Sequence, residues 1–268
     1  MDRRVYRTLL DEMQTSNRSL SRLFNKYLLE APQIPVRSKT KVHLVIDATY
    51  LPNGLCLIIY IDHDTRYVQL YRTTTQEKFR EICQDLKVLK SLGVDVYSVT
   101  CDGHKSILKA VTKAYPNATI QRCTVHVKRQ CRAYLSSKPK LQASKALLRI
   151  ANKITCIEQQ EQCSFWLLEF HNWYQEYSSI LLEESINEIT MKAWYTHKRL
   201  HQAYTLLFNT LPNLFCYLND GEIPKTPNRL ECYFKHLKEK LLLHSGLRYE
   251  AKRNFIKWYL HFKNNPSQ

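Results

Sequence analysis

VIDATY (45–50) is a short apolar stretch that carries one carboxylate, Asp47, near its end. A lone ionised carboxylate in a buried strand costs free energy unless it is paired or bound to a cation. A charged residue is therefore unexpected if this stretch is an ordinary core strand, but it is reasonable if other carboxylates lie close to Asp47. Two candidates lie downstream, Asp102 and Glu231, and the organisation of the chain decides whether they converge.

Composition points to a polyanionic partner. The chain has 268 residues, enough for one large or two smaller domains, and 40 Lys and Arg against 24 Asp and Glu give a net charge of +16. Such a surplus favours nucleic acid, with a membrane surface as the alternative. Because the sequence has no apolar run of membrane length and no secretory leader, we expect an intracellular, cytoplasmic and nucleoid-associated protein without membrane contact.

Cysteine and glycine usage exclude further classes. The nine cysteines are scattered and form no CxxC pair, which favours reduced thiols over a disulfide framework. The five glycines form no phosphate-binding loop, so a Walker or Rossmann nucleotide site is not expected.

The N-terminal half of the chain predicts an α/β domain. Residues 3–13 and 18–29 have helical periodicity and form either part of a helix-turn-helix or a helical hairpin packed on the main domain. After a Pro-containing linker the pattern becomes βββ-α-β-α-β, which indicates a mixed sheet. The expected strands are 42–48, 54–62, 66–71, 94–101 and 118–122, and the expected helices are 75–91 and 103–114.

The C-terminal half predicts helices almost throughout. The expected helical segments are 124–153, 158–182, 187–209, 227–242 and 248–262, and the spacing of Leu230, Phe234, Leu237 and Leu241 predicts a buried seam in the fourth of these. Trp166, Phe170, Trp173 and Tyr177 recur at helical spacing and are interpreted as an aromatic core stripe rather than a cofactor site.

Two of the candidate carboxylates are predicted to lie at strand ends, where functional residues are common in α/β sheets. Asp47 lies near the end of the first strand and Asp102 directly after the fourth; functional residues gather at such strand ends. Glu231 would join them from a helix. Hard oxygen donors suit Mg²⁺ or Mn²⁺ rather than zinc, and a two-metal site stabilises both oxygens of a phosphoryl transfer. The alternative for Asp102 is a helix N-cap.

Four blocks in order resemble the DDE/D transposases of the Mutator-like and related bacterial insertion-sequence group. They are VIDATYL (45–51), CDGHKSILKAV (101–111), IQRCTVHVKR (120–129) and TPNRLECYFKHLKEKLLLHSGL (226–247). In this resemblance Asp47, Asp102 and Glu231 match the catalytic, metal-holding carboxylates, and Cys123 and His126 match a Cys-x2-His motif.

The resemblance implies a fold and an activity. The fold would be an RNase H-like five-stranded mixed sheet with flanking helices and an all-helical insertion. The activity would be metal-dependent hydrolysis of DNA at transposon ends, followed by strand transfer of the 3′-OH into target DNA. The implied parts are a helical segment at 1–35, the first part of the core at 36–126, the insertion at 127–225 and the closing helices at 226–268.

Four residues have expected supporting roles. Asn228 lies one helical turn before Glu231 and shares its face, and His104 follows Asp102 and either reaches the scissile phosphate or lies on a helix surface. Cys123 and His126 are half of a zinc site, but only Cys131 lies nearby and His197 and His201 are distant. We therefore favour a structural or hydrogen-bonding role for this pair.

Two basic clusters flank the predicted site, and we expect them to contact DNA phosphates rather than only water. Trp194 and Tyr195 in the insertion are expected to pack in the core, with base stacking as the alternative. The first cluster is Arg122, Lys128, Arg129, Arg132, Lys138 and Lys140, and the second includes Lys235 and Lys238.

Two alternatives to an active transposase remain. One is a catalytically idle DNA-binding derivative, against which the complete carboxylate set argues; the other is a different RNase H-like nuclease, against which the helical insertion argues. Family members commonly carry a larger N-terminal part than residues 1–35, so we expect either a truncated copy or end recognition elsewhere. A homodimer or higher oligomer on DNA is expected, because two transposon ends must be joined.

Overall fold

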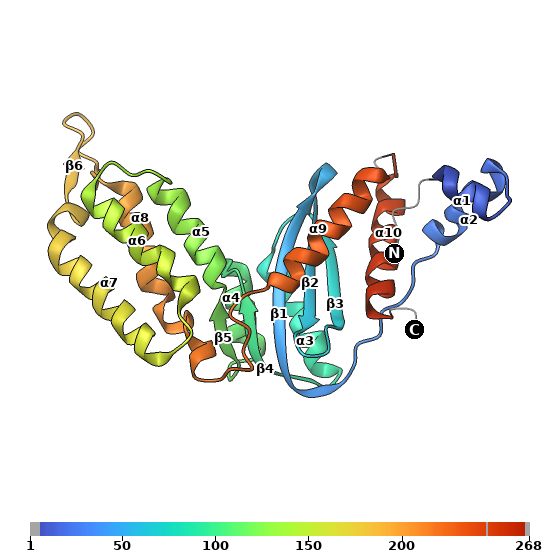
Figure 1. The fold of residues 1–268 in the computed structure, drawn as a ribbon, viewed down its shortest axis with the longest axis horizontal. Coiled ribbons are helices and arrows are strands. Elements are labelled where there is room, and N and C mark those ends of the chain that lie inside the picture. The colour runs from blue at the N-terminus through green and yellow to red at the C-terminus, as the bar shows by residue number, and fades with distance from the viewer. Residues whose placement is uncertain (1–5, 245, 266–268) are drawn as a thin grey trace.

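The computed structural model describes residues 6–244 and 246–265. A five-stranded mixed sheet lies at its centre, with helices on both faces and a separate helical lobe at one end (Figure 1). No helix in these residues is long and apolar enough to cross a membrane. The strands are β1 (Lys39–Leu51), β2 (Leu55–Asp62), β3 (Val68–Thr74), β4 (Val94–Cys101) and β5 (Thr119–Arg122).

Strand order confirms the predicted RNase H-like sheet. The order is β3-β2-β1-β4-β5, with β1 antiparallel to β2 and parallel to β4, and β4 parallel to β5. The hairpin turn expected at 52–54 is the short 3-10 helix η1 (Pro52–Gly54), where Gly54 adopts a φ of +70° that favours glycine. The parallel pairing places Cys101, the last residue of β4, opposite Ile46, so the carboxyl end of β4 lies beside the interior of β1. The predicted strand 42–48 was too short: β1 continues to Leu51, so Asp47 lies inside the strand and not near its end.

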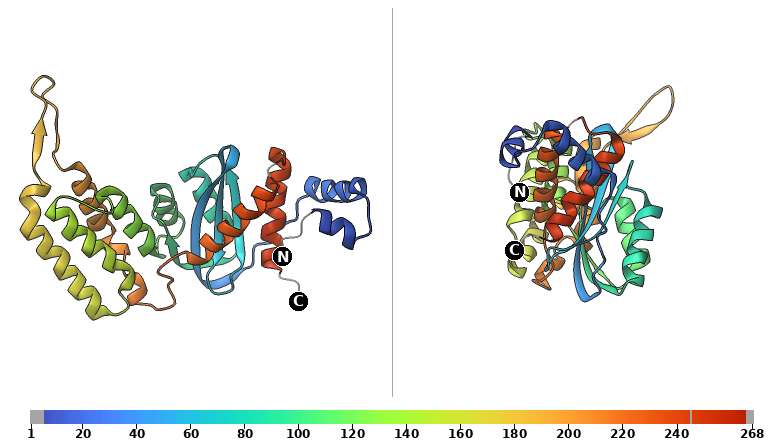
Figure 2. Two further views of the ribbon diagram at one scale, coloured as in Figure 1. Left: turned by 45° about the horizontal axis from the view of Figure 1, so that its top comes forward. Right: turned by 90° about the vertical axis from the view of Figure 1, so that its right-hand side faces the viewer.

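Alternation along β1 assigns its side chains to two cores. Val42, Leu44 and Ile46 face α3 (Phe79–Ser91) and α4 (Lys105–Ala114), whereas Val45 and Leu51 face α9 (Asn228–Leu243) and α10 (Tyr249–Asn264). Figure 2 shows these two helix pairs on opposite faces of the sheet. Because successive side chains alternate, Asp47 shares the α9 face with Val45.

The helical lobe differs from the sequence prediction in two places. The single helix expected at 124–153 is broken by a loop at 136–141, where Ser136 has a φ of +71° and Pro139 follows. Residues 184–195 form a two-stranded hairpin that projects from the lobe (Figure 2), not the start of a helix. The lobe contains α5 (Thr124–Leu135), α6 (Gln142–Lys153), η2 (Ile154–Cys156), α7 (Gln160–Leu181), β6 (Glu184–Ile186), β7 (Ala193–Tyr195), α8 (Lys198–Thr210), η3 (Leu211–Asn213) and η4 (Cys216–Leu218).

Local hydrogen bonding explains the missed hairpin. The side chain of Asn187 accepts from the backbone N–H groups of Ile189 and Thr190, which holds a turn in place of a helix. Ile189 is 93% exposed and Trp194 is 47% exposed, so this segment has no core to pack on. The expectation of core packing is therefore wrong for Trp194, whereas in the aromatic stripe of α7 Trp166, Phe170 and Trp173 are buried as predicted and Tyr177 is partly buried.

The N-terminal helices lie against the closing helix. They are α1 (Tyr6–Glu12) and α2 (Asn17–Leu29), and residues 3–5 of the first expected helix lie outside the described residues. Asn254 and Trp258 of α10 donate side-chain hydrogen bonds to the backbone carbonyls of Leu28 and Tyr27 in α2. This contact agrees with a helical hairpin packed on the main domain.

Candidate active site

Asp47 is a buried carboxylate on the central strand. Only 6% of the residue is exposed, and its Oδ1 accepts a hydrogen bond of 2.9 Å from the Ala48 backbone N–H. Burial raises the pKa of Asp47 to about 7, and the negative charges of Asp102, Glu231 and Glu77 add to the rise. The electrostatics thus place three further carboxylates within range of Asp47.

Asp102 follows β4 directly and also organises the next turn. Its Oδ1 accepts a 2.7 Å hydrogen bond from the His104 backbone N–H, just before α4 begins. Gly103 between them has a φ of +87°, and a Cβ there would lie 1.7 Å from the Nε of Arg122. Asp102 is therefore not the N-cap of α4, which is His104; its side chain holds the turn before the helix, and this fixes the carboxylate beside β1.

Glu231 reaches the site from α9. It lines, with Asp47 and His126, a cavity of about 450 Å³. Its Oε1 accepts a 2.7 Å hydrogen bond from Nη1 of Arg129 on α5. The helix is positioned by its apolar face, because Leu230, Phe234, Leu237 and Leu241 are buried against the sheet, as the sequence predicted.

Glu77 is an acidic residue that sequence reasoning missed. It precedes α3, its side chain is 8% exposed, and its Oε2 lies 3.5 Å from Nδ1 of His104. That oxygen is buried and accepts no hydrogen bond from the described residues. Burial and the charge of Asp102 raise the pKa of Glu77, while His104 opposes the rise. No spacing rule marks a carboxylate in a loop, so only the fold reveals its place.

The donor set suits a hard divalent cation. The carboxylates of Asp47, Asp102 and Glu231 are oxygen ligands of the type that Mg²⁺ and Mn²⁺ prefer, and the raised pKa of Asp47 shows the cost of leaving this charge without a cation. Within residues 6–244 and 246–265 no three acidic, His or Cys side chains are gathered closely enough to hold a metal as they stand. The Arg129–Glu231 pair accounts for part of this separation, since Arg129 occupies one oxygen of Glu231.

Cys123 and His126 have structural and site-facing roles. Cys123 is fully buried, caps α5 by accepting from the His126 backbone N–H at 3.4 Å, and has its pKa raised to about 12 by burial. The buried sulfur of Cys123 thus has a structural role at the start of α5. The Nδ1 of His126 is buried without a described hydrogen-bond partner, in a residue that lines the carboxylate cavity.

Some of the predicted supporting and basic residues lie at the carboxylate cavity, and others lie elsewhere in the structure. Lys235 and Lys238 line the carboxylate cavity, and Arg132 is exposed on α5. Lys128 instead donates to Thr155, and Arg122 lies against Gly103 at the sheet edge. Asn228 begins α9 and is exposed outside the residues that line the cavity.

Comparison with known families identifies the chain. Residues 4–205 match the family described as transposase, Mutator family. The chain belongs to the Mutator family of transposases. The matched region includes Asp47 and Asp102, and Glu231 lies beyond it.

Two solved structures resemble this Mutator-family chain. One is the HTLV-2 integrase catalytic core domain in complex with magnesium, 14% identical, TM-score 0.26, covering 62% of this chain and 99% of that one. The other is the simian T-cell lymphotropic virus intasome in complex with a PP2A regulatory subunit, 13% identical, TM-score 0.24, covering 64% and 59%. No curated protein matches the chain. The family match, not these distant likenesses, identifies it.

Proposed function

We propose that this Mutator-family chain hydrolyses the DNA phosphodiester at transposon ends and transfers the freed 3′-OH to target DNA. The observation that carries the proposal is the buried carboxylate of Asp47, whose pKa is raised to about 7 beside Asp102 and Glu231. A buried carboxylate with a strongly raised pKa beside other carboxylates is typical of a functional site. Membership of a transposase family supports the same chemistry.

Asp47, Asp102 and Glu231 are the residues that would hold Mg²⁺ or Mn²⁺. When bound, the metal supplies Lewis-acid stabilisation of the attacking and leaving oxygens of the phosphodiester. Burial of Asp47 excludes water from one side of the site, and the turn at Asp102 fixes its carboxylate. The Nδ1 of His126 has a hydrogen bond to give or accept at the cavity wall.

Cationic side chains at the cavity would bind the substrate phosphates. Lys235 and Lys238 lie on the same wall as Glu231, one and two helical turns further along α9. Arg129 pairs with Glu231 in the absence of DNA. A phosphate arriving at Arg129 would replace the carboxylate as its partner and release Glu231 towards Asp47. The ion pair is largely exposed, so this exchange costs little free energy.

The test is a cleavage and strand-transfer assay with the element's own ends and Mg²⁺ or Mn²⁺. Asp47→Ala and Asp102→Ala should each reduce both products by at least about 100-fold, because a few kcal/mol of charge stabilisation in the transition state is lost. Glu188→Ala, on the exposed hairpin, is the control and should keep full activity. Full activity in either aspartate variant would refute the proposal.

A further inference from the structure

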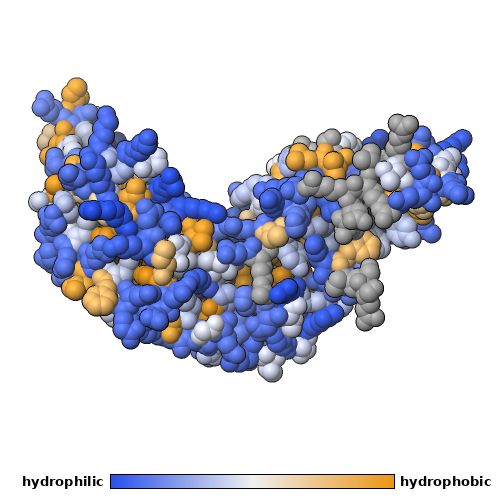
Figure 3. All heavy atoms as spheres, viewed as in Figure 1, coloured by the Kyte–Doolittle hydropathy of each residue, from blue (hydrophilic) through white to orange (hydrophobic). Residues whose placement is uncertain are grey.

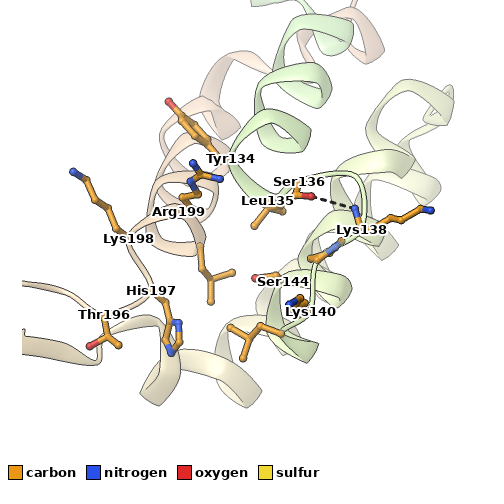
Figure 4. Close-up of a pocket in the computed structure, with 13 residues that line it drawn as sticks. Tyr134, Leu135, Ser136, Lys138, Lys140, Ser144, Thr196, His197, Lys198 and Arg199 are labelled. Carbon is orange, nitrogen blue, oxygen red and sulfur yellow. Dashed lines mark hydrogen bonds between the residues drawn. The ribbon is translucent and has the colours of Figure 1, made fainter.

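A second basic hollow lies in the helical lobe, away from the carboxylates. It is formed by the end of α5, the loop 136–141 and the starts of α6 and α8, with a volume of about 520 Å³ (Figure 4). Lys138 and Lys140 line the hollow from the loop, and Lys198 and Arg199 line it from the α8 side; in Figure 4 the side chains of Lys138 and Lys198 extend outward from its rim. Nothing in the chemistry at Asp47 accounts for this gathering of cations.

The four cationic side chains of the hollow have no acidic partner among the described residues, although His197, which also lines it, contacts Glu183. None of the residues that line it is Asp or Glu, and all four cationic side chains are exposed. The ion pairs found among the described residues include none of these four. Like charges gathered around a concave surface raise its potential, which attracts an anion.

A neutral donor accompanies the cations. Ser136 lines the hollow and brings a hydroxyl group of the kind that hydrogen-bonds phosphate oxygens, whereas the hydroxyl of Thr196 is bonded to that of Ser185. Ser136 Oγ also accepts from the Lys138 backbone N–H, which holds the loop against the hollow. Leu135 and Leu200 are buried beneath it and make it part of the folded lobe. The combination of cations and a hydroxyl group fits the backbone of a nucleic acid.

Helix α5 connects this hollow to the carboxylate cavity. His126, near its first turn, lines the carboxylate cavity, and Leu135, its last residue, lines the hollow. At 1.5 Å per residue these positions lie about 14 Å apart along the helix. Arg132 is exposed between them. One strand of DNA rises about 3.4 Å per nucleotide, so the two places are separated by roughly four base pairs.

The surface leaves room for such a path. Figure 3 shows the molecule hollowed between the helical lobe and the sheet, with mostly hydrophilic residues along this concave side. A duplex whose scissile phosphate lies at the carboxylates would pass along α5 in this direction.

We propose that the hollow binds the phosphate backbone of duplex DNA roughly four base pairs from the scissile phosphate. The inference rests on the proposed function for the choice of DNA, but it concerns binding and needs no chemistry. The hollow clamps the duplex at a second point, so it sets the direction in which the DNA leaves the active site.

The experiment measures binding of the full chain to a labelled duplex of the element's end, without divalent metal, over a series of salt concentrations. The test variant is Lys138→Gln/Lys140→Gln/Arg199→Gln. The matched control is Arg80→Gln/Lys87→Gln/Lys109→Gln, which removes the same charge from exposed positions on α3 and α4. Thermal midpoints verify that both variants fold.

We expect the test variant to bind about 10- to 100-fold more weakly than the control and to lose about two to three units of the salt slope, since each lost phosphate contact removes about 0.9. Lys138→Arg/Lys140→Arg should bind like the unaltered chain. Equal weakening of test and control variants would overturn the inference. So would duplex RNA bound with the same dependence on these residues, or inorganic phosphate that competes as strongly as DNA.

The two proposals fail separately. If the hollow variant loses binding but the unaltered chain cleaves no DNA with Mg²⁺ or Mn²⁺, the hollow stands and the proposed function falls. If the chain cleaves its ends and the hollow variant binds like the control, the function stands and the hollow falls.

Discussion

At the scale of single residues, Asp47 connects the packing of the fold to the proposed chemistry. Its neighbours on β1 supply the apolar core that buries it, and that burial is the largest cause of its raised pKa. A proton on the Asp47 carboxylate neutralises its charge, as a bound cation would. Ionisation of this group and binding of a divalent metal are therefore linked.

Metal affinity should depend on pH through Asp47. The folded protein keeps the Asp47 proton up to about pH 7, whereas the unfolded chain loses it near the ordinary value of 3.8. This group alone therefore makes the metal-free fold less stable as pH rises from about 4 to 7, because the unfolded state binds fewer protons. Over the same range the affinity for Mn²⁺ should rise by up to about tenfold per pH unit and then level off.

Calorimetric titration with Mn²⁺ across this range measures the effect. Asp47→Asn is the reference, since it has no proton to displace; it should bind Mn²⁺ weakly with little pH dependence and be more stable than the unaltered chain at pH 8. An affinity that stays constant from about pH 5 to pH 7 would contradict the assignment.

Glu77 should support the metal site. Glu77→Gln keeps the shape but removes the charge that lies beside His104 and acts on Asp47. We expect Mn²⁺ affinity to fall about tenfold, as for outer groups that orient ligands, and the pKa of Asp47 to fall. The control is Glu188→Gln on the exposed hairpin. Unchanged Mn²⁺ binding and unchanged cleavage in Glu77→Gln would show that Glu77 serves only the local structure.

At the scale of elements, α9 connects stability to the site. Its buried face packs on the sheet, and the same helix carries Glu231 and Lys235 into the carboxylate cavity. The alternation of β1 and the spacing of α9 therefore bring a strand residue and a helix residue together across one core.

Loosening α9 should cost stability and activity together. Leu237→Ala removes a side chain with no exposed surface, so it should lower the free energy of unfolding by about 2–5 kcal/mol. Leu243→Ala, at a position 66% exposed on the same helix, should change it by less than about 0.5 kcal/mol. Chemical denaturation measures both. If the two variants were equally stable, the packing of α9 on the sheet would be wrong.

At the scale of the whole molecule, charge should govern assembly. The net charge of +16 makes two copies repel one another, and DNA would neutralise that repulsion. We expect a monomer without DNA at low salt and a homodimer or higher oligomer with duplexes of the element's end. Sedimentation with and without DNA measures the change. A dimer of the same strength in both conditions would show that assembly does not depend on DNA.

The predictions that succeeded depended on local pattern. The βββ-α-β-α-β order and the buried seam of α9 were predicted from the periodicity of apolar residues, and the turn at Gly54 was predicted from its turn-forming residues. Each of these signals depends on residues only a few positions apart. The predictions failed where local hydrogen bonds override propensity. Asn187 holds a hairpin turn and Ser136 ends α5, and no period of apolar residues announces either.

The sequence by itself determined the mixed sheet, the basic character, and that Asp47 lies on a strand, Asp102 follows a strand and Glu231 lies on a helix. Only the tertiary structure decided which charges meet. It placed Glu77 beside His104, paired Arg129 with Glu231, and gathered Lys138 and Arg199 around one hollow. The physical reason is that strand ends and helix faces follow from short-range periodicity, whereas contacts between charges far apart in the chain depend on how whole elements pack.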